Sequence, residues 1–207
     1  MLGIVQRKVY NFYMQRIKLV LEYNGSKFCG WQRQKNARSV QEEVEKALSK
    51  LFGKQITVVG SSRTDAKVHA MAQVAHFDCS QEIPVSKIAV AVNSLLPDDV
   101  KVLCAKKVGN DFHARFDVKK KTYRYYLYKG KKNAILNDLV ATCDFPLDES
   151  AMQQCLKLFL GKHNFKAFCA SGAQVKSYER EIYDARLTKK GKYLIFEFTG
   201  NGFMQHM

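Results

Sequence analysis

Apolar and polar residues alternate from Ile17 to Tyr23, which is the pattern of a half-buried β-strand. A helix is predicted to begin after Ser39, because Glu42 follows three residues later and completes a capping-box pattern. Gly53 stands where many helices end. The apolar positions that this helix would turn towards the core are Val40, Val44, Ala47, Leu48 and Leu51.

Four more elements complete the first half of the chain. The predicted strands are 55–59, 73–77 and 100–108, and a helix over 85–96 is ended by Pro97. A polar turn at 60–65 separates the first two of these strands. The resulting order, β-α-β-β-α-β, is that of the ferredoxin-like arrangement.

The second half repeats this order in part. A strand is predicted over 122–128, and Asp148 is predicted to cap a helix that Gly161 ends. Two further strands are predicted at 180–187 and 193–199. The apolar face of the helix would consist of Met152, Cys155, Leu156, Phe159 and Leu160. By comparison with the first half, one helix and one strand are missing.

These patterns predict an α+β fold of two ferredoxin-like or RRM-like units, whose mainly antiparallel sheets flank a basic central cleft. We expect the first unit to span residues 16–110 and the second, incomplete at its C-terminus, to span 111–207. Residues 1–15 carry Arg7 and Lys8 but no acidic residue, and we expect them to form a poorly ordered leader.

The charge of the chain points to a polyanionic partner. Lys and Arg number 34 against 19 Asp and Glu, a formal net charge of +15. Nucleic acid is therefore the first expected partner and an anionic membrane the second. No apolar run approaches the ~18 residues of a membrane-spanning helix, so no membrane partner is expected. Six cysteines without a C-x-x-C pair predict free thiols, a reducing cytoplasmic location and no metal site.

Basic residues concentrate between 101 and 132, where eleven Lys or Arg face only Asp111 and Asp117, a net of 11 − 2 = +9. Tyrosines are interleaved with these cations. Cations bind phosphates and aromatic faces stack on bases, so the stretch as a whole favours RNA binding. For the tyrosines alone, packing inside a sheet is the favoured interpretation. These tyrosines are Tyr123, Tyr125, Tyr126 and Tyr128.

The most specific motif surrounds Arg63 and Asp65. On spacing alone, an Arg two residues before an Asp in a turn is a surface ion pair worth ~0–1 kcal/mol. However, the ordered blocks of this chain resemble those of the tRNA pseudouridine synthase A family from about residue 16 to 207. The blocks are YNGSKF at 23–28, GWQ at 30–32, SVQEE at 39–43, RTDA at 63–66, VHA at 68–70, QVAHF at 73–77, NSLLP at 93–97, DFHARF at 111–116, TYRY at 122–125 and NGF at 201–203.

The resemblance implies isomerisation of uridine to pseudouridine at positions 38, 39 or 40 of the tRNA anticodon arm, by a homodimer that needs no cofactor. Asp65 matches the essential aspartate of the family, which attacks C1′ of the ribose or stabilises charge there. Arg63 matches the arginine that pairs with it. Tyr123 matches the active-site tyrosine that stacks on the flipped base and is a candidate to remove the C5 proton.

The expected RNA contacts extend well beyond this motif. They are Trp31, Arg33, Lys67, Arg115, Lys119, Lys120, Lys121, Arg124 and Lys162. For Trp31, core packing and an RNA-facing role are equally favoured. His69 and His76 lack a partner at ligand spacing and are predicted to be structural rather than metal-binding.

Two departures from the family pattern bear on activity. Ser62 and Lys67 replace glycines in the catalytic motif, which strains the loop if those positions require φ > 0. Family members also continue beyond the block that ends at Met207, with a further helix and a segment that lines the uracil pocket. The alternative function is therefore a non-catalytic RNA-binding protein with two RRM-like halves. A third, an anionic-surface binder, explains the charge but not the ordered blocks.

Overall fold

The computed structural model describes residues 14–80, 83–132, 134–172 and 175–207. The chain divides into two compact units, one ending at Asp117 and the other beginning at Val118. Residues 1–13 of the predicted leader lie outside the described residues. Its last two residues, Met14 and Gln15, begin the first strand, and Gln15 is buried. The prediction of a poorly ordered leader is therefore wrong for these two residues.

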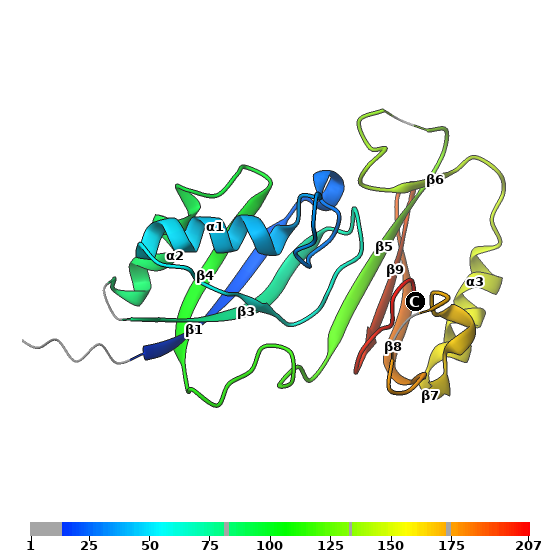
Figure 1. Ribbon diagram of the computed structural model, residues 1–207. Coiled ribbons are helices and arrows are strands. Elements are labelled where there is room, and N and C mark those ends of the chain that lie inside the picture. Colours follow the sequence, from blue (N-terminus) through cyan, green and yellow to red (C-terminus); the bar gives the residue numbers. More distant parts are fainter. Residues whose placement is uncertain (1–13, 81–82, 133, 173–174) are drawn as a thin grey trace, which may run out of the picture. The chain divides into compact units, whose positions relative to one another are not determined.

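The first unit has the predicted β-α-β-β-α-β order and antiparallel pairing throughout (Figure 1). Its sheet runs β2-β3-β1-β4, the strand order of the ferredoxin-like fold. Its elements are β1 (Met14–Tyr23), a 3₁₀ turn (Gly25–Lys27), α1 (Val40–Phe52), β2 (Val59–Gly60), β3 (Ala70–Ser80), α2 (Val85–Asn93) and β4 (Val100–Val108).

Buried and partly exposed side chains alternate along β1, so one face of the sheet carries the core. Ile17, Leu19 and Leu21 of β1 are completely buried in the core that α1 and α2 cover. Full burial of such side chains stabilises the fold by about 1.5–3 kcal/mol each. Helix α1 contributes the predicted apolar face, although Leu51 is only partly buried. Both helices lie on one face of the sheet (Figure 1).

Helix α1 begins where predicted but not by the predicted mechanism. The side chain of Ser39 makes no capping hydrogen bond and is buried. Instead the N–H groups of Val40 and Gln41 donate to the carbonyls of Gly30 and Trp31, at 3.2 and 3.0 Å. A neighbouring loop therefore satisfies the helix terminus, a solution that local sequence does not show. Gly53 ends the helix with φ 63°, as predicted.

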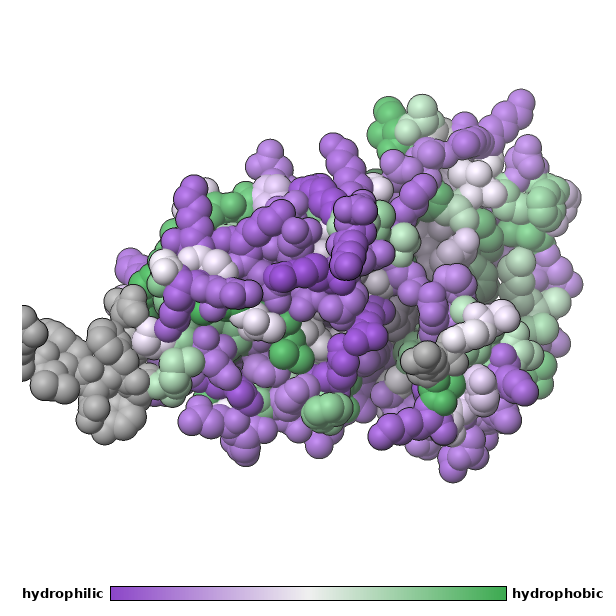
Figure 2. Space-filling view, viewed as in Figure 1, coloured by the Kyte–Doolittle hydropathy of each residue, from purple (hydrophilic) through white to green (hydrophobic). Residues whose placement is uncertain are grey.

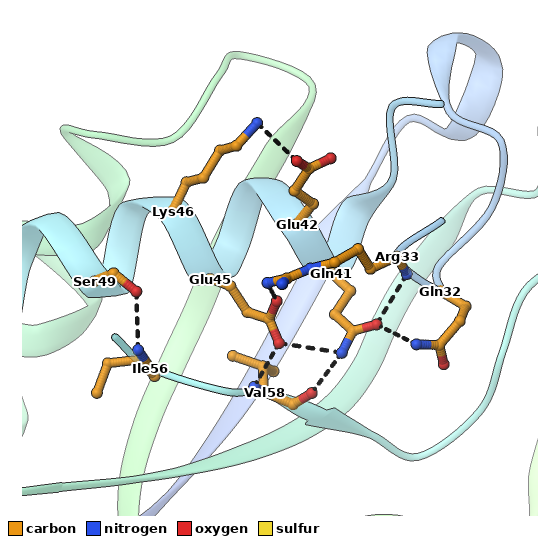
Figure 3. Close-up of polar contacts among 9 residues, drawn as sticks. All are labelled: Gln32, Arg33, Gln41, Glu42, Glu45, Lys46, Ser49, Ile56 and Val58. Carbon is orange, nitrogen blue, oxygen red and sulfur yellow. Dashed lines mark hydrogen bonds and ion pairs between the residues drawn. The ribbon is translucent and has the colours of Figure 1, made fainter. Parts of the chain in front are cut away.

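The strand predicted over 55–59 is wrong for all but its last residue, because side chains of α1 bind its backbone. Ser49 Oγ accepts from the N–H of Ile56, and Glu45 Oε1 accepts from the N–H of Val58, both at 2.9 Å (Figure 3). Gln41 Nε2 donates to the carbonyl of Val58 at 3.0 Å. These bonds replace the ladder that a strand would need.

Helix α2 ends at Asn93 rather than at the predicted Leu96. The amide of Asn93 bonds both backbone groups of Val102 in β4, at 2.8 and 2.9 Å. The remaining residues before Pro97 form a turn.

The second unit contains a five-stranded sheet in the order β6-β5-β9-β8-β7, antiparallel except for the β5–β6 pair. Asp148 caps α3 as predicted, accepting from the N–H of Ala151 at 2.9 Å. Its elements are β5 (Lys121–Lys129), β6 (Ala141–Cys143), α3 (Glu149–Leu156), β7 (Gly161–Asn164), β8 (Glu179–Lys190) and β9 (Tyr193–Gly200), with 3₁₀ turns at Lys157–Phe159 and Lys166–Phe168.

Three features of this unit differ from the predictions. Strands β6 and β7 were not predicted, because three and four residues are too few for a periodic signal. Helix α3 ends at Leu156, and Gly161 opens β7 with φ 92° instead of ending the helix. Packing of the β5 tyrosines inside the sheet is also wrong. None of the four is buried, and Tyr125 is 59% exposed.

Several large apolar side chains of the second unit are exposed. Phe145 and Leu158 are 66% and 75% exposed, and apolar areas are visible over the part of this unit that carries α3 (Figure 2). Hydrophilic side chains dominate the visible face of the first unit around α1 (Figure 2). No helix in the described parts of the chain is long and apolar enough to cross a membrane.

We expect Gly60→Ala to destabilise the first unit by about 1–3 kcal/mol, because the new Cβ would overpack a closed core. It would lie 2.4 Å from Cε2 of the buried Trp31 indole. Urea unfolding measures the change. In a Trp31→Phe background the smaller ring should reduce the cost of Gly60→Ala, and an equal cost in both backgrounds would contradict this contact.

Candidate active-site loop and RNA-binding residues

The segment that carries Arg63 and Asp65 is the connection 61–69 between β2 and β3, called here the active-site loop. Its first residues are fastened to β3. The N–H of Ser61 donates to the carbonyl of Val74 at 2.8 Å, and the Gln73 amide donates to the carbonyl of Ser62 at 2.7 Å. Both serine hydroxyls also reach Gln73 Oε1, at 3.2 and 3.1 Å. The loop therefore leaves the sheet in a fixed direction.

The centre of the loop is held through Thr64, which is buried. Its carbonyl accepts from the N–H of Trp31 at 3.0 Å, and its hydroxyl bonds Tyr23 Oη at 2.8 Å. Gly30 is required for this approach, because it has φ 101° and a Cβ there would lie 2.5 Å from the Thr64 carbonyl oxygen. On either side of Thr64, Arg63 is exposed and Asp65 is partly exposed. The fold thus buries the middle residue and presents its two charged neighbours.

The C-terminal end of the active-site loop is bound by the loop between β1 and α1, which also contains Trp31. The N–H of Lys67 donates to the carbonyl of Phe28 at 3.1 Å, and the N–H of Gly25 donates to Nδ1 of His69 at 3.2 Å. A Cβ on Gly25 would lie 2.1 Å from the carbonyl oxygen of Val68. His69 is therefore a structural hydrogen-bond acceptor, as predicted, and no metal-binding cluster occurs among the described residues.

Of the two residues that replace the motif's glycines, only Lys67 occupies a left-handed conformation. Its φ is 64°, whereas Ser62 is not among the described residues with positive φ. A residue other than glycine in this region costs about 1–2 kcal/mol. The side chain of Lys67 is exposed, so its charge is available at the surface of the loop.

Arg115, a predicted RNA contact, is partly exposed and lies within the electrostatic influence of Arg63, a predicted catalytic residue. Burial, followed by the positive charge of Arg63, lowers the pKa of Arg115. Arg115 follows Ala114, whose N–H donates to Nδ1 of His76 at 3.1 Å. Residues 111–117, expected in the second unit, thus pack on the first, and His76 is hydrogen-bonded within the fold as predicted.

Trp31 is not an RNA contact in this structure. Its side chain is 1% exposed and packs beside Tyr23 and Gly60, so it has no accessible face for a base. Arg33 forms an ion pair with Glu45, whose side chain is 3% exposed, while the side chain of Arg33 remains 48% exposed (Figure 3). Arg33 therefore links α1 to the loop before it and is still accessible from solvent.

The remaining predicted RNA contacts lie at the start of the second unit or within it. Lys119 and Lys120 are exposed, and Lys121 opens β5 with a partly exposed side chain. Lys162 in β7 forms an exposed ion pair with Glu179 at 3.3 Å, worth little in water.

Arg124 lines a surface pocket of about 270 Å³ on one face of the second sheet. It forms an ion pair with Glu197, as does Arg186 of β8 at 2.7 Å, and the hydrogen bond from Arg124 lowers the pKa of Glu197. Sequence reasoning missed Arg186 and Lys190, which line the same pocket. Their position follows from the pairing of β8 with β9, which no sequence motif indicates.

Tyr123 occupies β5 opposite Phe198, with a partly buried side chain. Its ring meets that of Phe203 edge-on, with centroids 4.9 Å apart. Asp65 and Arg63 belong to the first unit and Tyr123 to the second.

We expect Lys67→Gly to leave the loop intact and to raise the free energy of unfolding by about 0.5–1 kcal/mol. Relief of the left-handed strain outweighs the greater entropy of glycine in the unfolded chain. Lys67→Val should instead destabilise, since a β-branched residue tolerates this conformation poorly. Urea unfolding of both variants tests this, and equal stabilities would contradict it.

The comparisons with known proteins agree with the motif. The family model described as tRNA pseudouridine synthase matches residues 19–117 and 155–207. A protein named tRNA pseudouridine synthase A from Syntrophomonas wolfei is 45% identical over 195 residues, which cover 94% of this chain and 78% of that protein. Proteins of the same name from Ruminiclostridium cellulolyticum and Colwellia psychrerythraea are 43% and 44% identical, over 94% and 93% of this chain and 80% and 74% of their own lengths. The chain therefore belongs to the tRNA pseudouridine synthase family.

Proposed function

We propose that this isomerase converts uridine to pseudouridine at positions 38, 39 or 40 of the tRNA anticodon stem-loop, with Asp65 as the nucleophile. The observation that carries the proposal is the active-site loop, which lies within the family match and presents Arg63 and Asp65 on a backbone fixed from both ends. Precise placement of a reacting group is a large part of catalysis, and such fixation provides it.

The reaction conserves atoms and electrons. The bond from N1 of uracil to C1′ of ribose breaks, the base turns, and C5 bonds to C1′. The proton lost from C5 is balanced by one gained at N1, so the reaction needs no oxidant, reductant or cofactor. Direct attack at C1′ and a glycal route both require a carboxylate beside the sugar, and Asp65 has that role.

Arg63 and Tyr123 complete the proposed chemistry. The guanidinium of Arg63 pairs with the carboxylate of Asp65 and directs it towards the sugar. The target base must leave its stem, at a cost of a few kcal/mol, before Tyr123 can stack on it and accept the C5 proton. Exposed cations of both units offset that cost by binding tRNA phosphates. The proposed contacts are Arg33, Lys67, Arg115, Lys119, Lys120, Lys121, Arg124 and Lys162.

We further propose that the enzyme acts as a homodimer in the cytoplasm. Six free cysteines among the described residues support a reducing compartment. Sedimentation equilibrium should give twice the mass of the chain, and a monomeric mass at assay concentration would contradict the dimer.

Asp65→Asn should lower the rate of tritium release from C5-labelled tRNA by at least about 10³-fold, because the amide cannot act as the nucleophile. Filter binding of tRNA should change less than threefold. Asp98→Asn, which removes an exposed carboxylate of the same unit, is the matched control and should keep full activity. Turnover retained by Asp65→Asn would refute the nucleophile. A wild-type protein that binds tRNA but releases no tritium would favour the non-catalytic alternative.

Binding of tRNA should weaken steeply with salt, because a protein of net charge +15 displaces counterions from RNA phosphates. With 6–10 phosphate contacts, the affinity should fall by about 10³- to 10⁵-fold between 50 and 200 mM salt. Filter binding across this range measures the slope. Vesicles rich in anionic lipid should bind only weakly, and vesicle affinity equal to that for tRNA would favour the anionic-surface alternative.

A further inference from the structure

The face of the first sheet opposite α1 and α2 is charged at one end. Across β1 and β3, Arg16 pairs with Asp78 and Lys18 pairs with His76. These residues alternate with core positions of the same strands, such as Ile17 and Phe77, so their side chains project from the face of the sheet that α1 and α2 do not cover. Residues 110–117, called here the covering segment, lie against this end of the sheet through Arg16 and His76.

Arg16 fastens the start of the covering segment. Its Nε and Nη2 donate to the two carboxylate oxygens of Asp78, each at 2.8 Å, which fixes the plane of the guanidinium. The remaining Nη1 donates to the carbonyls of Asn110 and Phe112, at 2.8 and 2.9 Å. A lysine has no planar fork and cannot make these four contacts at once.

His76 fastens the middle of the segment. The side chain is 4% exposed, and its Nδ1 accepts from the N–H of Ala114, which is itself buried. The rings of Phe112 and His113 meet the imidazole edge-on, with centroids 6.0 and 5.0 Å away. This acceptor exists only while Nδ1 carries no proton.

The segment ends in a compact turn that presents Arg115. The N–H groups of Phe116 and Asp117 both donate to the carbonyl of His113, at 3.1 and 2.9 Å. Arg115 lies inside this turn, directly after the residue that His76 holds, and is close enough to Arg63 for that charge to affect it. The side chain of Arg115 is partly exposed, so its guanidinium is accessible to a phosphate group, which it can bind by charge-assisted hydrogen bonds.

We propose that Arg16 and His76 are positioning residues that hold the covering segment in the conformation that presents Arg115 to a phosphate group of the RNA. The identity of the RNA as tRNA rests on the proposed function. The positioning itself rests on the four backbone and carboxylate contacts of Arg16 and on the bond from Ala114 to His76.

The test compares two substitutions of one residue. His76→Phe keeps a ring but leaves the N–H of Ala114 without its acceptor, whereas the Oδ1 of His76→Asn can take the place of Nδ1. At pH 7.5, His76→Phe should raise KM for tRNA by about three- to tenfold with kcat changed less than twofold, and His76→Asn should restore KM. Arg16→Lys should behave as His76→Phe. Val92→Ala, buried on the helix-covered face, is the control for general destabilisation and should leave KM unchanged.

A double-mutant cycle shows whether His76 acts through Arg115. Arg115→Ala alone should raise KM about tenfold and reduce the slope of log affinity against log salt by about 1, the loss of one phosphate contact. In that background His76→Phe should have no further effect on either quantity. Equal effects of His76→Phe with and without Arg115 would overturn the proposal.

The pH dependence gives a second readout. Burial first, then the charges of Arg16 and His113, lower the pKa of His76 from 6.5, and Asp78 and Asp117 oppose this. Lys18 is the other charged neighbour across the strands. As pH falls below 6.5, the unfolded chain therefore binds a proton that the folded chain resists, and the covering segment is destabilised.

Affinity for tRNA at constant salt should therefore fall between pH 6.5 and 5.5 in the wild type and much less in His76→Asn. An equal fall in both would show that His76 does not cause the effect and would overturn its role. The binding measurements need no turnover. A protein that shows these binding effects but releases no tritium would contradict the proposed isomerisation and leave the positioning intact.

Discussion

The backbone contacts between the loop after β1 and the active-site loop are the constraint on which the rest of the first unit depends. The Trp31 N–H binds the Thr64 carbonyl, and the carbonyl of the same tryptophan accepts from the first turn of α1. The loop between Tyr23 and Val40 thus provides the acceptors for the start of α1 and also fixes the backbone of Thr64. Gly30 permits this because a side chain there would meet the backbone of the active-site loop.

Acidic side chains bind many of the cations in both units. In the first unit Arg16 pairs with Asp78 and Arg38 pairs with Asp99. In the second unit Arg124 and Arg186 share Glu197, and Lys129 and Lys189 share Glu149, so much of the charge is neutralised within the sheet. Arg115 differs from these paired cations, because burial and then the positive charge of Arg63 lower its pKa. Ionisable groups perturbed in this way are often found at functional sites.

Periodicity predicted the elements that carry a long amphipathic pattern. Strand β4 and helix α1 have the predicted bounds, and α3 has the predicted cap, because each follows from spacing within its own segment. Predictions failed where a distant group satisfied the backbone. The residues before β2 bind side chains of α1, and Ser39 caps nothing because the loop before it supplies the acceptors.

For the candidate site, the sequence by itself determined where the family motif lies and that Ser62 and Lys67 stand at two of its glycine positions, since motif and residue type are local properties. Only the tertiary structure decided that Lys67 is the strained position and that Trp31 belongs to the core. It also decided that the charge of Arg63 acts on Arg115, which belongs to a segment docked on the first sheet. The reason is physical: burial and the proximity of charges depend on strand register and loop docking, which join residues far apart in the chain.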